Sequence, residues 1–372
     1  MKRIFFVAGE SSGDTHGAAL IRALRGLEPD LQAEGLGGQA MAEAGMALRE
    51  DLAGQAIMGF TEVVKHLLPM RRLMLDTVEH LRATRPDGLV LIDYPGFNIR
   101  LAQRAHRLGI PIVYYISPQV WAWKKQRIHT IARCVGKMLV IFPFEEQLYR
   151  DVGMDCTYVG HPLVEHVAAY APEAGPEGPP VIGVLPGSRA QEIGRLLEPM
   201  LGVARGIRER YPEARFVTPC VNEARGAQVR ALAGDFPLEV VTGGMYGVLA
   251  AARLCLVASG TATLETALFG TPMVILYRVS AGSYWLARWL VDVEHIGIVN
   301  ILAGRRIVPE FIQQDATPEK VLPTALELIR DTPARVQMLA DLDAVRRALG
   351  GGGASARAAR EVLHFLEGGV QG

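Results

Sequence analysis

The stretch IFFVAGESSGD, residues 4–14, shows the unit from which this chain is built: an apolar run, a Gly/Ser turn and the start of a helix. The uninterrupted apolar run at 4–8 is typical of a strand that is buried on both faces of a sheet. Behind the turn, the pattern predicts a helix at 14–27. A buried strand followed at once by a helix favours an α/β protein with a parallel sheet.

The same unit recurs along the 372 residues. Further strands are predicted at 88–92, 111–116, 137–142, 181–185, 215–219, 238–242, 254–258 and 272–277. Helices are predicted at 72–84, 191–210, 223–233 and 261–269, and from about Pro318 the chain is expected to be helical. This alternation indicates parallel sheets that are covered by helices on both faces.

The segment YAPEAGPEGPP at 170–180 interrupts the alternation with four prolines and two glycines. Such a composition is typical of a linker. We therefore expect two Rossmann-like domains, residues 1–170 and 181–372, and the length of the chain suits two domains. Ligands of such sheets bind at the carboxyl ends of the strands, so two domains that face each other would enclose a ligand cleft.

Composition argues against several classes of protein. The formal net charge is zero, which disfavours a general nucleic-acid binder. The four cysteines form no CxxC pair and no HxH or HExxH pattern occurs, so no metal site is expected. The apolar start is too short for a signal peptide and no window is long enough for a membrane span, so we expect a cytoplasmic protein.

Two acidic motifs follow predicted strands of the first domain. The turn GESSGD at 9–14 carries Glu10 and Asp14, which would repel a pyrophosphate, so a hydroxyl-rich ligand such as a sugar suits it better. The segment IDYPGFN at 92–98 has Asp93 at a strand end, where a carboxylate with a raised pKa can take a proton from an attacking hydroxyl. A simple turn capped by Asp14, or a helix capped by Asp93, explains the same residues equally well.

Two Gly/Ser-rich turns follow predicted strands of the second domain: LPGSR at 185–189 and ASGTATLE at 258–265. Small residues let the backbone approach a phosphate, and helix N-termini offer it free N–H groups. Arg189 adds a positive charge that suits a diphosphate, and Glu265 can accept hydrogen bonds from ribose hydroxyls. Plain strand–helix turns with ordinary helix caps are the alternative. The candidate ligands are Gly187, Ser188, Arg189, Glu192, Ser259, Gly260, Thr261 and Glu265.

Two segments of the first domain mix large apolar residues with cations: IMGFTEVVKHLLPMRRLML at 57–75 and YYISPQVWAWKKQR at 114–127. Such mixing favours an anionic bilayer surface, and tryptophans beside cations suit sugar faces, acyl chains or anionic headgroups. A buried core helix and a core aromatic cluster are the alternatives, and Pro69 argues against one continuous helix. The candidate acceptor and membrane residues are Ser11, Ser12, Met58, Phe60, Leu67, Leu68, Arg71, Arg72, Trp121 and Trp123.

Taken in order, the segments VAGESSGD, IMGFTEV, IDYPGFN, YYISPQVWAWKKQR, FPFE, YVGHPL, LPGSR, ASGTATLE and NILAG resemble the motifs of the lipid-A-disaccharide synthase family, and they extend over residues 7–304. The resemblance implies a GT-B glycosyltransferase with two Rossmann-like domains and the active cleft between them. It also implies catalytic roles for Asp93, Glu10, Arg189 and Asn300.

The resemblance further implies an inverting reaction. The donor is UDP-2,3-diacylglucosamine, the acceptor is 2,3-diacylglucosamine 1-phosphate, and the products are the β-1′,6-linked lipid A disaccharide and UDP. The implied place of action is the cytoplasmic face of the inner membrane, against anionic lipids, with no metal, no cofactor and no nucleic acid. This chain departs from the family pattern at Gly96, where a second acid is frequent, and at Val299, where proline is common.

Three other classes of protein fit parts of the pattern. A UDP-N-acetylglucosamine 2-epimerase shares the two-domain architecture, but it has no need of the segments at 57–75 and 114–127. A dinucleotide-binding oxidoreductase is disfavoured because the GxGxxG fingerprint is missing. A non-catalytic nucleotide sensor would have no use for Asp93 at a strand end.

Overall fold

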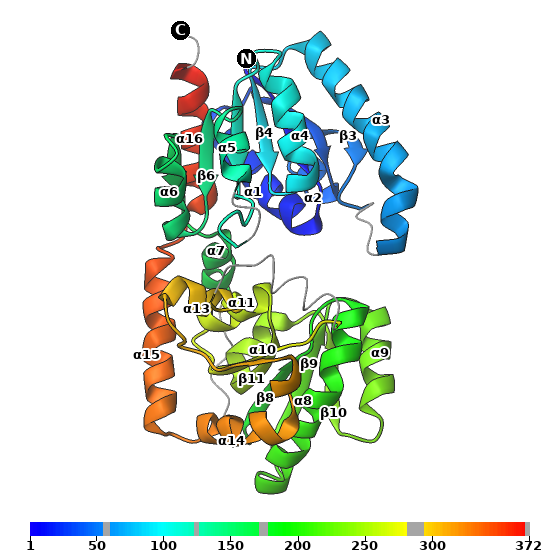
Figure 1. The fold of residues 1–372 in the computed structure, drawn as a ribbon, viewed down its shortest axis with the longest axis vertical. Coiled ribbons are helices and arrows are strands. Elements are labelled where there is room, and N and C mark those ends of the chain that lie inside the picture. Colours follow the sequence, from blue (N-terminus) through cyan, green and yellow to red (C-terminus); the bar gives the residue numbers. More distant parts are fainter. Residues whose placement is uncertain (55–59, 123–125, 171–177, 281–293, 369–372) are drawn as a thin grey trace. The chain divides into compact units, whose positions relative to one another are not determined.

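The chain forms two compact α/β units, Met1–Pro162 with Gly352–Gly372, and Leu163–Gly351 (Figure 1). The computed structural model describes residues 1–54, 60–122, 126–170, 178–280 and 294–368, with residues 60–67 described by their backbone alone. Within these residues, no helix combines the length and the apolar character that are needed to cross a bilayer.

The first unit is built on a parallel sheet in the order β3-β2-β1-β4-β5-β6-β7. Its central strands β1, β4 and β5 are wholly buried apart from Arg3, which is why their sequences are continuous apolar runs. The strands are β1 (Arg3–Ala8), β2 (Gln32–Gly37), β3 (Ala47–Asp51), β4 (Gly88–Ile92), β5 (Ile112–Tyr115), β6 (Lys137–Val140) and β7 (Cys156–Tyr158).

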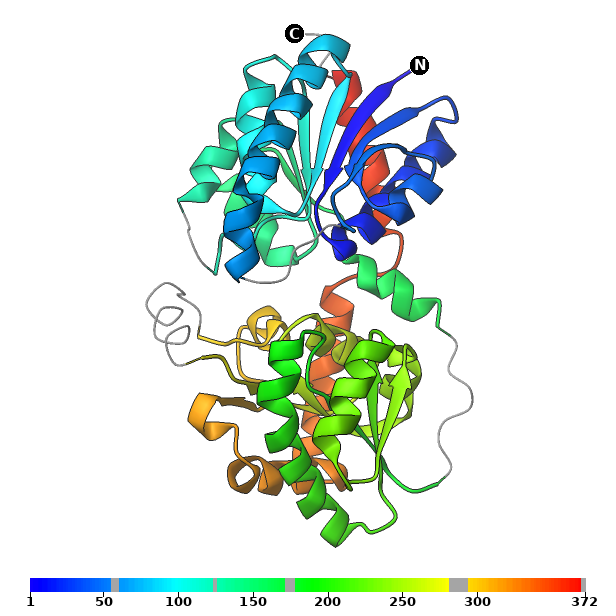
Figure 2. The ribbon, with the colours of Figure 1, turned by 90° about the vertical axis from the view of Figure 1, so that its right-hand side faces the viewer.

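Helices cover both faces of this sheet, with α3 and α4 on one face and α1 and α16 on the other (Figure 2). Right-handed crossovers produce this division, because the chain leaves β1 and β4 toward opposite edges of the sheet. The helices are α1 (Ser11–Leu27), α2 (Gln39–Glu43), α3 (Phe60–Thr84), α4 (Pro95–His106), α5 (Arg127–Ala132), α6 (Pro143–Arg150) and α16 (Ala354–Gly368).

The second unit repeats the plan, with the strand order β10-β9-β8-β11-β12-β13. Its strands are β8 (Val181–Leu185), β9 (Arg215–Cys220), β10 (Leu238–Thr242), β11 (Ala252–Ala258), β12 (Met273–Tyr277) and β13 (Glu310–Ile312). Its helices are α7 (Pro162–Ala168), α8 (Ala190–Arg210), α9 (Glu223–Ala233), α10 (Met245–Ala251), α11 (Thr261–Leu268), α13 (Ile298–Ala303), α14 (Pro318–Ile329) and α15 (Pro333–Ala348).

The C-terminal helix differs from the expectation that residues 181–372 form one domain, because α16 packs on the sheet of the first unit. Added Cβ atoms at Gly88 and Gly136 would meet Leu366 and Phe365 of this helix within 3 Å, so these two glycines make room for it. The buried ammonium of Lys137 adds an ion pair to Glu361 at 2.9 Å.

Most elements appear where the sequence predicted them, and the differences have local causes. The strand β2 was missed because Glu34 and two glycines interrupt its apolar pattern, and β3 because its sequence ALRED is largely exposed. The helix α3 runs through Pro69, so the expectation of a break there is wrong. Pro69 is exposed, which lets water solvate the carbonyl that loses its partner in the preceding turn. The predicted linker at 170–180 falls largely on residues 171–177, outside the described residues.

Candidate active site

Each sheet has one topological switch point, where neighbouring strands continue toward opposite edges. In the first unit this point lies between β1 and β4, which pair side by side from Ile4 with Gly88 to Ala8 with Ile92. Open α/β sheets bind ligands in the crevice at the carboxyl ends of such a strand pair. Glu10 follows β1 closely and Asp93 directly follows β4, so the first predicted site lies at a switch point.

The backbone at Asp93 adopts a conformation that is rare for residues with a side chain. Asp93 and Tyr94 have φ values of 47° and 48°, in the left-handed region. Hydrogen bonds hold this turn: the Asp93 carbonyl accepts from the Tyr114 hydroxyl at 2.6 Å and from the Asn98 amide at 2.8 Å. Ile116, at the end of the neighbouring strand β5, is also left-handed, with φ 66°. Strain of this kind clusters at functional sites, where surrounding contacts must maintain it.

The electrostatic environment makes the Asp93 carboxyl an unusually good proton acceptor. Burial, followed by the negative charge of Glu10, raises the pKa of Asp93 to about 6, against the lowering effect of the Tyr94 N–H. The group is therefore mostly ionised at neutral pH but more basic than an exposed carboxylate. A pKa near the working pH is what general base catalysis requires. The alternative role as an ordinary helix cap is not observed, since the residue that caps α4 is Tyr94, without a side-chain bond.

Gly9 and Tyr94 fix the two turns against each other. A Cβ atom on Gly9 would lie 2.2 Å from the Tyr94 ring, so glycine is required for this close approach. Burial and then the charge of Glu10 raise the pKa of the Tyr94 hydroxyl, which indicates that Glu10 is close to it. Glu10 itself is exposed and precedes α1, with Ser11 and Ser12 exposed in the first turn.

Asp14, the second acid of the GESSGD turn, has a structural role. Its buried carboxylate accepts the backbone N–H groups of Gly38 at 2.9 Å, and of Ala40 and Met41 at 3.0 Å each. These bonds cap the N-terminus of α2, not of its own helix as the sequence suggested. Glu10 is thus the acid of this turn that remains exposed to a ligand.

The switch point of the second unit lies between β8 and β11, which pair from Val181 to Leu185. The two Gly/Ser-rich turns follow these two strands, so the residues 186–189 and 259–261 lie at neighbouring strand ends. The left-handed φ of 106° at Gly187 requires glycine in the first turn. The fold therefore brings both predicted parts of the nucleotide site together.

Glu192 does not point outward as a free ligand but closes its own turn. Its carboxylate accepts the N–H groups of Ser188 at 3.1 Å and Arg189 at 3.2 Å, and pairs with the Arg189 guanidinium at 3.0 Å. A diphosphate would seek the same donors. In the structure, the Glu192 carboxylate therefore occupies the N–H donors that the sequence assigned to an anionic ligand. The acid three residues after Arg189, a capping pattern, could have predicted this contact.

The second turn presents polar groups with different exposure. Gly260 and Thr261 are exposed, whereas Ser259 is half-buried and donates to the Ile296 carbonyl at 3.4 Å. Glu265 is partly buried, which raises its pKa, and the hydroxyl of Tyr246 opposes that rise through a hydrogen bond. A carboxylate held in this way keeps lone pairs available for hydroxyl donors.

Asn300 is fully buried, and its hydrogen bonds give it a supporting place in the structure; the catalytic role implied by the resemblance stays a prediction. Its amide donates to the Val308 carbonyl at 2.9 Å and to Glu310 at 2.7 Å, and its carbonyl accepts two further backbone N–H groups. Glu310 also accepts the N–H of Gly297 at 2.8 Å. Asn300 therefore ties α13 to the start of β13, and Val299 fits this helix as a buried residue.

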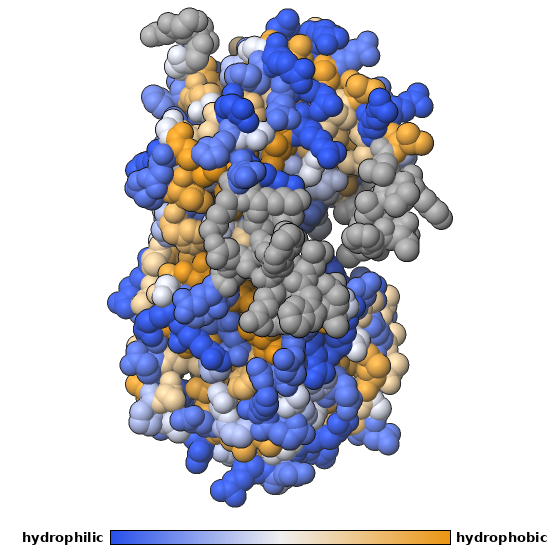
Figure 3. Space-filling view, viewed as in Figure 1, coloured by the Kyte–Doolittle hydropathy of each residue, from blue (hydrophilic) through white to orange (hydrophobic). Residues whose placement is uncertain are grey.

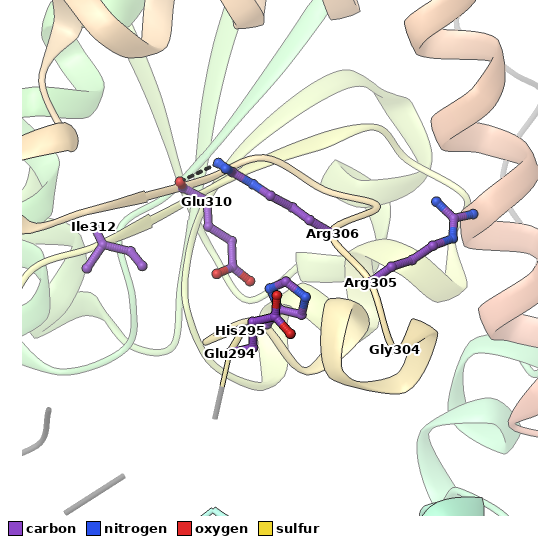
Figure 4. Close-up of a pocket in the computed structure, with 7 residues that line it drawn as sticks. All are labelled: Glu294, His295, Gly304, Arg305, Arg306, Glu310 and Ile312. Carbon is purple, nitrogen blue, oxygen red and sulfur yellow. Dashed lines mark hydrogen bonds between the residues drawn. The ribbon is translucent and has the colours of Figure 1, made fainter. Parts of the chain in front are cut away.

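A pocket of about 440 Å³ lies beside this network, and sequence reasoning missed it (Figure 4). In the figure Glu310, His295 and Glu294 lie together, whereas Arg305 points away toward α15, where it pairs with Asp341. In the sequence, the two adjacent arginines after Gly304 were the only feature that could have indicated this pocket. The lining residues are Glu294, His295, Gly304, Arg305, Arg306, Glu310 and Ile312.

The segment predicted to meet a membrane includes two exposed leucines of α3. Leu68 and Leu75 are 76% and 56% exposed, and Arg71 and Arg72 between them are exposed as well. Figure 3 shows hydrophobic and hydrophilic residues side by side over this helix. Met58 and Trp123, and the side chains of Phe60 and Leu67, lie outside the described residues.

Gly96 is exposed with open space around it.

Two Rossmann-like sheets, each with polar residues at its switch point, define an α/β protein of the GT-B class. Solved structures with this fold include S. aureus MnaA with UDP (TM-score 0.68, 15% identity, covering 99% of this chain and 97% of that one) and the calicheamicin glycosyltransferase CalG4 (0.63, 16%, 99% and 98%). The epimerase from Neisseria meningitidis bound to UDP-GlcNAc is equally similar (0.64, 11%, 98% and 100%). These likenesses show the fold and do not separate transferases from epimerases.

Sequence comparison separates them. The family model for lipid-A-disaccharide synthetase matches residues 4–358. Lipid-A-disaccharide synthases from Syntrophus aciditrophicus and Geobacter sulfurreducens are 42% and 40% identical to this chain, covering 98% of it and 98% and 97% of their own lengths. The chain therefore belongs to the lipid-A-disaccharide synthetase family. Its activity is the glycosyl transfer that forms the lipid A disaccharide, which confirms the resemblance and sets the three rival classes aside.

Proposed function

We propose that the first unit holds the acceptor, 2,3-diacylglucosamine 1-phosphate, and that the second unit holds UDP-2,3-diacylglucosamine. The division rests on the two switch points. The first carries carboxylates and aromatic rings, which suit a hydroxyl-rich sugar, whereas the second carries backbone N–H groups and Arg189, which suit a diphosphate. The structures of MnaA with UDP and of the Neisseria epimerase with UDP-GlcNAc support a uridine nucleotide as the ligand of this fold.

Asp93 acts as the general base, and its strained, partly buried position with a pKa of about 6 is the observation that carries this proposal. The acceptor hydroxyl attacks the anomeric carbon as its proton passes to the Asp93 carboxylate. The bond from that carbon to the β-phosphate oxygen breaks, and UDP departs with the electron pair. Attack opposite to an α-linked UDP gives the β-linked disaccharide in one step, without a covalent enzyme intermediate.

The second unit stabilises the departing UDP. Arg189 neutralises negative charge that develops on the diphosphate, and Ser188 and Arg189 donate backbone N–H groups to it. Glu192 holds these donors in the free protein and must release them to the ligand. Glu265, with Tyr246 beside it, accepts hydrogen bonds from the ribose hydroxyls.

The protein works at the cytoplasmic face of the inner membrane, where its acylated substrates reside. Leu68 and Leu75 would enter the lipid surface while Arg71 and Arg72 pair with anionic headgroups. Each basic residue near such a surface contributes about 1 kcal/mol, screened by salt. Trp121 belongs to the acceptor side of this surface, and Trp123 lies outside the described residues.

The direct test is incubation of the protein with both diacylglucosamine substrates, followed by mass spectrometry for the disaccharide and a separate assay for UDP. We expect both products in equal amounts, and neither when the acceptor is omitted. Release of UDP with the donor alone, or conversion of UDP-N-acetylglucosamine to an epimer, would contradict the proposal.

A further inference from the structure

A buried carboxylic acid in the first unit takes no part in the mechanism above. Glu145, in the first turn of α6, is 1% exposed. Its oxygens accept the indole N–H of Trp121 at 3.2 Å and the backbone N–H of Phe142 at 3.3 Å, and the Ser117 hydroxyl bonds to it as well. The bond to Phe142 alone would cap the helix. The bonds to Trp121 and Ser117 need another explanation.

Trp121 and Phe144 form an aromatic pair, and its one polar group, the indole N–H, bonds to the buried Glu145. The two rings meet edge to face with centroids 5.3 Å apart, and Phe144 stacks on Phe142 at 5.8 Å. Trp121 and Phe144 are both half-buried, so each leaves part of its ring exposed. The indole N–H faces Glu145, and what faces outward is carbon. An edge-to-face pair is rigid only if something fixes the rotation of the indole, which the bond to Glu145 does.

The cluster formed by Glu145, Trp121, Ser117 and Phe144 lies at strand ends near the one that carries Asp93. Asp93 follows β4, Ser117 lies just beyond β5 and Phe142 just beyond β6, and these strands are adjacent in the sheet. Strands lie about 4.8 Å apart, so the aromatic pair is on the order of 10 Å from the Asp93 turn. The Ser117 hydroxyl bonds to the Tyr149 hydroxyl at 2.7 Å, and Tyr114 of β5 bonds to the Asp93 carbonyl. A diacylated sugar with its hydroxyl at Asp93 would cover this distance.

We propose that Glu145 is a positioning residue of the acceptor site: by holding the indole N–H it fixes Trp121 against Phe144, so that the aromatic pair receives the acyl-substituted acceptor beside Asp93. The inference rests on the proposed function, in which Trp121 belongs to the acceptor side. Glu145 touches no substrate and acts through Trp121.

The neutral acid suffices for this role. Burial raises the pKa of Glu145 to about 8, against the bonds from Phe142, Trp121 and Ser117, so the carboxyl is mostly protonated at neutral pH. A neutral carboxyl still has a carbonyl oxygen that accepts the indole N–H. Glutamine has the same shape and keeps one carbonyl oxygen that can accept the indole N–H, although its NH2 group can no longer accept the Phe142 N–H. Leucine has a similar volume and no acceptor at all.

The test compares Glu145→Leu with Glu145→Gln in steady-state kinetics, varying each substrate in turn. We expect Glu145→Leu to raise the KM for 2,3-diacylglucosamine 1-phosphate about 10-fold, the size of one lost buried hydrogen bond, with the donor KM unchanged. Glu145→Gln should restore the acceptor KM to within about 2-fold of the original value. Tyr149→Phe is the matched control, because it removes a buried bond of the same cluster without touching Trp121. An equal rise in the control, or a rise in both KM values, would overturn the proposal.

Trp121→Phe supplies a test that does not depend on the folding of the leucine variant. It keeps an aromatic ring and removes the N–H, so it should also raise the acceptor KM, and adding Glu145→Leu to it should cause no further rise. Additive effects, or no effect of Trp121→Phe, would reject the inference. If the unchanged protein forms disaccharide and these variants do so with normal KM values, positioning by Glu145 fails while the proposed function stands. If the unchanged protein forms none, the proposed function itself fails.

Discussion

The two switch points share one topology but carry opposite chemistry. In the first unit, Asp93 has no cation beside it among the described residues; burial and the nearby Glu10 raise its pKa. In the second unit, Glu192 is surrounded by N–H donors and the Arg189 guanidinium. Strand order thus fixes where a ligand binds, and the local charge decides whether the site accepts a proton or holds an anion.

The largest effect should come from removing the proton acceptor of the first switch point. Asp93→Asn keeps the shape of the side chain but cannot take a proton, so turnover should fall by about 10²–10⁴-fold. UDP affinity, measured by calorimetry, should barely change because the proposed nucleotide site lies in the other unit. Asp235→Asn, at an exposed aspartate, is the control and should leave both quantities unchanged. Near-normal turnover of Asp93→Asn would mean that the first switch point does not act as a proton acceptor, which would contradict its contrast with the second.

At the second switch point, Arg189→Ala should weaken UDP binding by about 1.5–3 kcal/mol, the value of a charge-assisted hydrogen bond. Arg205→Ala, on the exposed face of the same helix, is the control. Glu192→Gln sharpens the comparison, since it removes the negative charge that holds the same donors and should tighten UDP binding. Titration calorimetry measures all three variants. Equal UDP affinity in Arg189→Ala and the control would show that this turn does not hold the diphosphate.

A stability measurement tests whether Asp14 has a structural role, which the sequence alone left open. Asp14→Ala removes three hydrogen bonds to the N-terminus of α2 and should lower the free energy of unfolding by about 2 kcal/mol. Asp30→Ala, at an exposed position, should change it little. Urea unfolding followed by circular dichroism measures both. A stable Asp14→Ala protein that has lost turnover would instead make Asp14 part of the active site.

The smallest effect concerns the surface beside the first site. Replacing Leu68 and Leu75 with serine should lower partitioning onto anionic vesicles about 10-fold, because two exposed leucines are lost from the apolar surface. Leu232→Ser, on α9 of the second unit, removes an exposed leucine elsewhere and should have no effect. Co-sedimentation over a salt series is the measurement. Equal binding of all variants would exclude this part of α3 as the membrane contact.

Sequence reasoning found the strands of both switch points and the motifs behind them because buried parallel strands are continuous apolar runs. It left a capping role open for both Asp14 and Asp93, since both are acids close behind a strand and only the fold shows which one meets backbone N–H groups. It also assigned α16 to the wrong unit, because the glycines that accommodate it, Gly88 and Gly136, lie more than two hundred residues away.

Two further residues have hydrogen-bond partners that the motifs alone did not reveal. The amide of Asn300 bonds to the Val308 carbonyl and to Glu310, eight and ten residues further along the chain, so the structure holds this residue as a buried support. Glu145 was overlooked because its partner Trp121 is 24 residues earlier and on another strand end. The sequence shows both motifs, SPQVWAW and FPFE, but only the structure shows that Trp121 of the first contacts Glu145 of the second.

The most direct test of the contrast between the switch points is the pH dependence of kcat/KM for the acceptor. Asp93 is active as the carboxylate, so the rate should rise with pH through about 6 and level off above it. Glu10→Gln removes the charge that helps to raise the Asp93 pKa, so the rise should move to lower pH while persisting. Asp93→Asn should show a low rate without this rise. An unmoved profile in Glu10→Gln, or the same rise near pH 6 in Asp93→Asn, would contradict Asp93 as the general base.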